Sequence, residues 1–167
     1  FITPITPPIR EGVSNYAGLS DALLKNLYLI DGTSEENILL VSGEQIYRMD
    51  YSAVLAHHAN HDADVTMAGI PAANANGARF STALEVDGVD VTALRCNVKI
   101  SDAPDNLLWP IQVCVIKRKK LVELLSTFNA ADHTDISLTE LIGAHLDLFK
   151  RVLAYRFGET AGRVTQD

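Results

Sequence analysis

Short apolar runs alternate along this sequence with segments of helical periodicity, and this alternation restricts the fold more than any other feature. Residues 38–42 form a nearly continuous apolar run, as expected of a strand that helices cover on both faces. Asp50 can cap a helix over residues 51–60, and residues 64–70 return to strand-forming types. Strand, helix and strand in this order predict a right-handed βαβ unit, with residues 38–42 as a buried parallel strand.

The rest of the chain continues the alternation. A helix is predicted over residues 20–30, with Ser20 or Asp21 as its cap, and the dipeptide Asp87-Gly88 predicts a hairpin. The remaining elements are expected as strands over residues 79–86, 89–95, 111–116 and 152–157 and as helices over residues 119–128 and 138–148. This order predicts an α/β fold with a mostly parallel, mixed sheet.

Length and charge exclude some classes of partner. A chain of 167 residues is the size of one soluble domain, so we expect a single domain over residues 1–167. Its 14 Lys and Arg against 21 Asp and Glu give a net charge of −7, which argues against a nucleic-acid partner. The basic run at residues 117–120 falls at a predicted strand-to-helix junction, where we favour a solvated face over a phosphate-steering patch.

The apolar and cysteine content indicates the compartment. No apolar stretch approaches the ~20 residues of a membrane span, and the start does not resemble a signal peptide, so no membrane association is expected. Cys96 and Cys114 do not make a disulfide framework, and Cys114 lies inside an apolar run. The lack of a disulfide framework and the apolar surroundings of Cys114 favour a reducing cytoplasm.

The end of the first predicted strand is the first place to look for chemistry. In open α/β sheets the ligand lies beyond the carboxyl ends of the strands, and here Gly43 and Glu44 follow directly. A glycine lets a ligand approach the backbone closely, and a carboxylate can hold Mg²⁺ against phosphate oxygens. An acidic residue at a strand end is also common as a merely solvated group.

A pair of histidines offers a second candidate site. His57 and His61 lie four residues apart on a predicted helix, a spacing that zinc sites use. No Glu stands between them in a zinc-protease pattern, and the sequence offers no evident third ligand. We therefore favour an exposed polar helix face for His57, His58 and His61.

Two longer segments resemble a known family. Residues 40–52 read LVSGEQIYRMDYS and look like the LAGDHIYKMDYS segment of ADP-glucose pyrophosphorylases. Upstream, residues 15–26 read NYAGLSDALLKN and are similar to the WYRGTADAVYQN segment of that family. The resemblance continues more loosely over most of the chain. It implies a partial, Rossmann-like nucleotidyltransferase domain, with the β-helix domain of the family lying outside the chain.

The resemblance also implies an activity and a set of site residues. Family members transfer an adenylyl group from ATP to glucose 1-phosphate, forming ADP-glucose and pyrophosphate for glycogen or starch synthesis, and they are typically tetramers. The family's magnesium-binding and catalytic Asp falls on Glu44. The nucleotide-binding or sugar-binding positions carried over are Gly18, Asp21, Gly43, Lys99 and Asp135.

Several positions depart from the family pattern. The EKP motif, whose Lys grips the sugar phosphate, falls at residues 96–98, and Lys99 serves only if the register shifts. The SMGIYVF strand, which lines the glucose site, corresponds to residues 110–116 and loses its Ser and Gly. The HDFG motif corresponds to residues 134–137 and keeps Asp135, which can equally cap the following helix.

These departures leave two hypotheses of different classes. The first is an active adenylyltransferase domain that uses Mg²⁺; the second is a degenerate regulatory or structural subunit that binds a ligand or partner without turnover. The Gly-rich phosphate loop and the WRDVGT segment of the family fall outside the sequence, so the isolated chain is expected to be weakly active or inactive. A related transferase using another nucleotide or sugar also stays open.

Overall fold

The computed structural model describes residues 2, 4–5, 16, 18–42, 48–75, 80–127 and 136–158. Its helices are α1 (Leu19–Lys25), α2 (Leu27–Asp31), α3 (Tyr51–Asn60), α4 (Arg118–Thr127) and α5 (Leu138–Ala144). Its strands are β1 (Asn37–Val41), β2 (Val65–Pro71), β3 (Phe80–Asp87), β4 (Asp90–Lys99), β5 (Leu107–Lys117) and β6 (Val152–Arg156). Short 3-10 turns cover Ala72–Asn74, Ile100–Asp102 and Leu146–Leu148.

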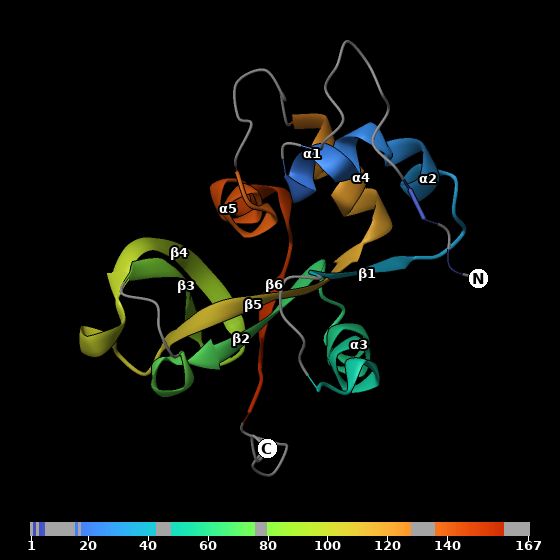
Figure 1. The fold of residues 1–167 in the computed structure, drawn as a ribbon. Coiled ribbons are helices and arrows are strands. Elements are labelled where there is room, and N and C mark those ends of the chain that lie inside the picture. The colour runs from blue at the N-terminus through green and yellow to red at the C-terminus, as the bar shows by residue number, and fades with distance from the viewer. Residues whose placement is uncertain are drawn as a thin grey trace.

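The strands form one mixed sheet in the order β1-β5-β2-β6-β4-β3 (Figure 1). An additional antiparallel pairing of β3 with β5 closes the five strands from β5 to β3 into a ring, with β1 attached outside it. In the part of the chain that the structure describes, only β2 and β6 pair in parallel. The predicted mostly parallel, Rossmann-like sheet is therefore wrong: this is a closed, mostly antiparallel arrangement.

The long strand β5 is the physical cause of this difference. It pairs antiparallel with β1, with β2 and with β3, so the sheet is organised around it. Strands β1 and β2 run in the same direction, as a βαβ unit requires, but β5 lies between them. An apolar pattern identifies a buried strand and gives no information on a neighbour that lies far away in the sequence.

Strand β1 lies at the edge of the described sheet and is only partly buried, with Val41 exposed, so the prediction of a buried central strand is wrong. Ile38 and Leu40 pack against the main core, whereas Leu39 packs against a second cluster on the other face. Arg118 N–H donates to the carbonyl oxygen of Glu36, and Ser42 N–H donates to the carbonyl oxygen of Gln112 in β5. The even-numbered residues of this segment therefore direct their backbone N–H and C=O groups toward β5. Because hydrogen-bonding direction alternates along an antiparallel pair, the odd residues direct their backbone groups to the open edge.

The main core lies between the sheet and the helices α1, α2, α4 and α5, and α3 covers the opposite side (Figure 1). Aliphatic side chains of α4 and α5 are fully or almost fully buried there against residues of β2 and β5. These residues are Leu121, Leu124, Leu125, Leu141 and Ile142 from the helices and Met67, Cys114 and Ile116 from the strands. The helices thus cover the face of β5 that carries Cys114.

The helix ends follow local capping chemistry, and two predictions about them fail. Asp50 accepts hydrogen bonds from the backbone N–H groups of Ser52 and Ala53, as predicted for the cap of α3. Neither Ser20 nor Asp21 caps α1, because the helix already begins at Leu19 and both side chains lie in its first turn. The predicted helix over residues 20–30 is interrupted at Asn26, which separates α1 from α2.

The other predicted elements occur with shifted ends. The hairpin at Asp87-Gly88 forms as predicted, with Gly88 in the left-handed region at a φ of 60°. The helix predicted over residues 138–148 ends at Ala144 and continues as a 3-10 turn. Within the described residues, none of the helices has the length and hydropathy needed to cross a membrane.

Candidate ligand-binding cavity

A cavity of about 430 Å³ lies where the start of α1, the middle of β5 and the start of α5 meet. Its wall includes residues 18–19, residues 110 and 112–114, and residues 136–140 with Ile142. Leu40, Met67 and Thr82 complete the wall from β1, β2 and β3. The cavity thus collects side chains from segments that lie far apart in the sequence.

The start of α5 forms the polar side of the cavity. Ser137 is the N-cap of α5 and makes a capping box with Glu140, in which each side chain accepts from the backbone N–H of the other. The Ser137 hydroxyl also donates to Glu140 Oε2 at 2.8 Å. From the opposite side Thr82 Oγ1 donates to Glu140 Oε1 at 3.4 Å, which connects β3 to α5. Glu140 is therefore fixed within the cavity wall.

A buried residue of α1 holds the segment that precedes α5. Ser20 has a relative exposure of 1%, and its hydroxyl donates to the backbone carbonyl of Ile136 at 3.2 Å. A buried hydroxyl without a partner is costly, so this bond specifies how α1 and residue 136 pack. The cavity wall at residues 136–140 is consequently held by α1, by β3 and by its own capping box.

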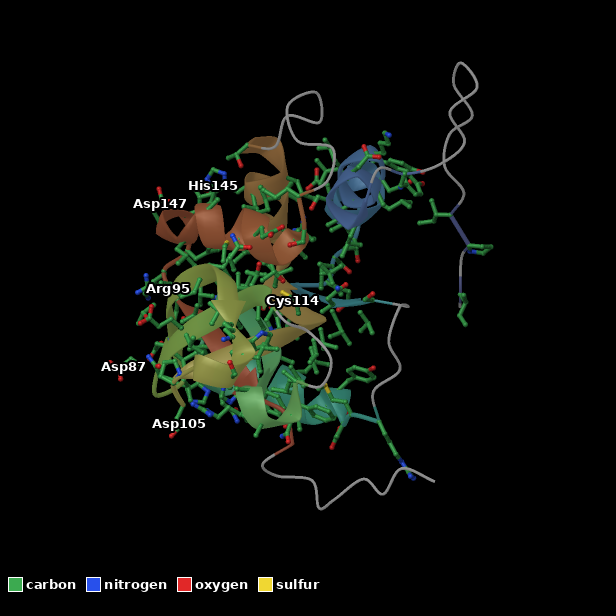
Figure 2. The ribbon with its side chains drawn as sticks, turned by 60° about the vertical axis from the view of Figure 1, so that its left-hand side comes forward. Asp87, Arg95, Asp105, Cys114, His145 and Asp147 are labelled. Atoms are coloured by element: carbon green, nitrogen blue, oxygen red, sulfur yellow. The ribbon has the colours of Figure 1, made fainter. Side chains whose placement is uncertain are left out.

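The floor of the cavity is apolar. Leu40, Met67, Val113 and Cys114 contribute to it, and Figure 2 shows Cys114 in the interior, between the strands and the helices. Burial raises the pKa of the Cys114 thiol to about 12. The thiol is therefore neutral at physiological pH and acts as a small apolar group rather than as a nucleophile.

A bulge in β5 shapes the cavity beside this floor. Met67 lies opposite Cys114 and Gly69 lies opposite Pro110, so three residues of β5 face one residue of β2. The central residue of the three is Gln112, which is exposed and has a φ of 56°. This left-handed conformation favours glycine, and glycine is the residue that the SMGIYVF motif has at this position.

The sequence-predicted site residues separate into three groups. Gly18 lines the cavity. Asp21 is buried in the first turn of α1 and forms an ion pair with Lys25 at 2.7 Å. Lys99 is exposed at the end of β4 and is not one of the residues of the cavity wall. Gly43, Glu44 and Asp135 lie outside the described residues, and the N-cap of α5, which Asp135 was a candidate to provide, is Ser137.

No metal site is evident in the described segments. They hold no group of three or more His, Cys, Asp or Glu side chains that could bind a metal ion. The chemistry of the described cavity wall does not fit Mg²⁺ either, because Glu140 is its single Asp or Glu and both its oxygens accept hydrogen bonds. We therefore assign no catalytic step to a metal ion at this wall.

The histidines of α3 are more buried than predicted. His57 and His61 have ring centroids 4.5 Å apart, and His61 Nδ1 contacts the carbonyl oxygen of His57 at 2.8 Å. His58 has a relative exposure of only 1%, so the predicted exposed polar face is wrong for this residue. Burial lowers the pKa of both His57 and His58.

The basic run at residues 117–120 lies at the strand-to-helix junction, as predicted, and lines a second cavity of about 400 Å³. Lys117 contacts Asp62 at 2.8 Å and Asp64 at 3.2 Å, and Arg118 contacts Asp31 at 3.2 Å. Lys120 contacts Glu123 at 2.9 Å. Lys117 and Arg118 thus join this junction to neighbouring segments, whereas the Lys120 pair lies within α4.

Sequence reasoning missed the polar wall of the first cavity. Thr82, Ser137 and Glu140 were not among the predicted site residues. A signal for two of them was present, because Ser137 and Glu140 follow the spacing of a capping box ahead of an apolar helix. No local signal could identify Thr82, which reaches Glu140 only through the pairing of β3 in the closed sheet.

Comparison with known proteins agrees with the resemblance in the motifs. The family described as nucleotidyl transferase matches residues 4–88. Glucose-1-phosphate adenylyltransferase 2 of Vibrio cholerae is 27% identical over 174 residues, which cover 100% of this chain and 42% of that protein. Glucose-1-phosphate adenylyltransferase of Bacillus licheniformis is 31% identical over 157 residues, covering 92% of this chain and 40% of that protein. The chain thus spans only about two fifths of the length of these relatives, and it belongs to the nucleotidyl transferase family.

Proposed function

We propose that this chain is part of a cytoplasmic enzyme that transfers an adenylyl group from ATP to glucose 1-phosphate, releasing pyrophosphate. The cavity at the start of α5 carries the proposal. Its wall includes Gly18, four residues between positions 110 and 114, and Ile136 with Ser137. These positions belong to the three segments that were aligned with the WYRGTADAVYQN, SMGIYVF and HDFG motifs, so segments that are distant in sequence line one cavity.

The chemistry of the wall suits the sugar ring of such a substrate. Hydroxyl and amide groups of Thr82, Gln112, Ser137 and Thr139 line it, together with an apolar floor. Ligand pockets of this kind combine apolar contact area with a few polar groups that fix orientation. In the proposed function, the apolar floor contacts the carbon face of the ring and the polar wall binds its hydroxyl groups.

Two parts of the proposal rest on residues outside the described segments. Magnesium binding at Glu44 and a contribution of Asp135 to the sugar site stay predictions from the resemblance. Among the described residues the cavity wall contains no Lys or Arg, so the phosphate of the substrate needs a cation from elsewhere. Lys99, on β4, stays the predicted candidate.

That missing cation also favours the second candidate function, a degenerate subunit that binds a sugar ligand without turnover. The described part of the wall, with one carboxylate and no Lys or Arg, is poorly suited to stabilise the charge that develops during phosphoryl-type transfer. Assembly with other subunits, which the resemblance predicts, could supply the remaining groups in either case.

The experiment that tests the proposal measures pyrophosphate release from ATP and glucose 1-phosphate with Mg²⁺. It compares the chain as given with Glu44→Asp and with Thr139→Phe, which places a bulky side chain in the cavity wall. Thr92→Phe, at an exposed position of β4, is the matched control. Turnover that Thr139→Phe abolishes and Thr92→Phe retains supports the transferase. Cavity-dependent sugar binding without turnover in any variant supports the degenerate subunit, and neither binding nor turnover rejects both.

A further inference from the structure

The position of Glu140 in the cavity wall has a consequence for ligand orientation. Oε2 accepts hydrogen bonds from the backbone N–H of Ser137 at 3.1 Å and from its hydroxyl at 2.8 Å. Oε1 accepts from Thr82 at 3.4 Å, which is longer than the roughly 2.5–3.0 Å of an ordinary O–H···O hydrogen bond and marks a weak contact. A carboxylate oxygen has two lone pairs, so the weakly bonded Oε1 can accept further hydrogen bonds.

The charge of the wall restricts which ligand groups suit this oxygen. Glu140 is the one Asp or Glu among the described wall residues, and that wall contains no Lys or Arg. A phosphate group placed next to an uncompensated carboxylate is repelled, whereas a ligand hydroxyl that donates to it forms a charge-assisted hydrogen bond. The start of α5 therefore selects for the uncharged, hydroxyl-bearing end of a ligand.

From this arrangement we propose that Glu140 binds a hydroxyl group of the sugar directly through Oε1, and that Thr82 is a positioning residue that orients the carboxylate. The inference rests on the proposed function, because it requires a sugar to enter the cavity. It adds that the phosphate points away from α5. Neither residue was identified from the sequence.

The geometry supports this division of roles. The capping box holds Oε2 toward the helix backbone, so the carboxylate cannot rotate freely and Oε1 keeps a fixed direction. Thr82 contacts that same oxygen from β3. A donor held in advance against the carboxylate reduces the rotamer freedom that ligand binding would otherwise remove.

The test is a titration of the full chain with glucose and with glucose 1-phosphate, followed by calorimetry or NMR. The variants are Glu140→Gln, Thr82→Val and, as the matched control, Glu123→Gln on the exposed side of α4. The amide oxygen that Glu140→Gln introduces can still accept from Ser137 N–H, so the capping interaction is preserved while the charge is removed. Thr82→Val leaves the capping box itself intact, which keeps the test valid if Glu140→Gln unfolds.

We expect Glu140→Gln to weaken both ligands about 10-fold, as for the loss of a hydrogen bond to a charged group, and Thr82→Val to weaken them by a few fold. A series of deoxyglucoses should identify one hydroxyl whose removal weakens binding to the native chain but not to Glu140→Gln. Glu123→Gln should leave both affinities unchanged.

Three results would overturn the inference. Unchanged affinities in Glu140→Gln and Thr82→Val, with binding still lost in Thr139→Phe, would reject the role of these two residues and leave the proposed function standing. Tighter binding of glucose 1-phosphate to Glu140→Gln would place the phosphate, not a hydroxyl, beside the carboxylate. Absence of any sugar binding by the native chain would reject the inference together with the proposed function.

Discussion

His58 Nδ1 lies 2.9 Å from Thr66 Oγ1, in an interior position between α3 and β2. On the other side of the ring, Nε2 lies 3.2 Å from Asn37 Oδ1 of β1. Because an amide oxygen only accepts, the arrangement is satisfied by a neutral ring that donates from Nε2 and accepts from Thr66 at Nδ1. One buried histidine thus links α3 to two strands of the sheet.

Mild acid is expected to destabilise the fold through this residue. Burial is the main cause that lowers the pKa of His58 below its ordinary value of 6.5; Lys117 and His57 also lower it, whereas Asp64 and Asp62 oppose the shift. As the pH falls below about 6.5, the unfolded chain therefore binds more protons than the folded chain, and the free energy of unfolding decreases as the pH decreases. Urea unfolding between pH 7.5 and 5 should show this slope, and His58→Gln should reduce it. An equal slope in His58→Gln would assign the effect to another group.

Asp64 is expected to be essential for stability, unlike its neighbour Asp62. Asp64 has a relative exposure of 5%, accepts the backbone N–H of Lys150 at 2.6 Å and contacts Lys117 at 3.2 Å. Asp64→Ala removes a buried carboxylate that accepts the partly buried N–H of Lys150, and it should lower the free energy of unfolding by about 1–3 kcal/mol. Asp62→Ala, at an exposed carboxylate that shares the same lysine, should have a much smaller effect. Equal losses in the two variants would contradict this assignment.

The contribution of Asp64 should also depend on pH. Burial acts to raise the pKa of Asp64, but hydrogen bonds from Lys150 and Lys117 and the charge of Lys117 outweigh burial and lower it below 3.8. The stabilisation is therefore present above pH 3.8 and is lost as the pH falls through the folded-state pKa. The difference in unfolding free energy between the native chain and Asp64→Ala should shrink below pH 3.8.

Gly143 permits the close approach of α5 to β4. A Cβ atom at this position would lie 2.5 Å from Leu94 Cδ2 and 2.7 Å from Leu94 Cβ, so the backbone or the leucine would have to move, and Leu94→Ala removes the nearer of these two contacts. Gly143→Ala should therefore destabilise the chain by about 1–3 kcal/mol, although alanine favours helix formation. Combining it with Leu94→Ala should recover part of the loss in a double-mutant cycle. Strict additivity of the two losses would show that the contact does not limit the packing.

The left-handed conformation of Gln112 should make this position tolerant of glycine and intolerant of β-branched residues. Gln112→Gly relieves an unfavourable φ of 56° but increases the entropy of the unfolded chain, and these effects of about 1 kcal/mol each nearly cancel. Gln112→Val should cost at least about 1 kcal/mol more than Gln112→Gly. Thermal unfolding of both variants measures the difference, and a Val variant as stable as the Gly variant would refute the strained bulge.

The two cysteines should differ in reactivity. Cys96 is exposed on β4, whereas Cys114 is buried and its pKa is raised to about 12. Iodoacetamide at pH 7.5 should modify Cys96 in the folded chain and Cys114 only after unfolding, because the thiolate is the reactive form. Mass spectrometry of peptides from folded and unfolded samples tests this expectation. Rapid modification of Cys114 in the folded chain would mean that the cavity opens in solution.

The sequence by itself determined the local structure and the family. The cap at Asp50, the hairpin at Asp87-Gly88 and the approximate positions of the strands depend on neighbouring residues and periodicity, and all were predicted. The segments at residues 15–26 and 40–52 were long enough to identify a nucleotidyltransferase, which the match over residues 4–88 confirmed.

Only the tertiary structure decided the order and direction of the strands and the composition of the cavity wall. The apolar run that became β1 predicted a central parallel strand, because an apolar pattern reports burial and carries no information about partners. Its neighbour is β5, in which Lys117 pairs with Asn37 although the two residues lie far apart in the sequence. The contact between Thr82 and Glu140 depends on the same long-range pairing. Strand direction and the cavity are set by packing between distant segments, so local residue types could not specify them.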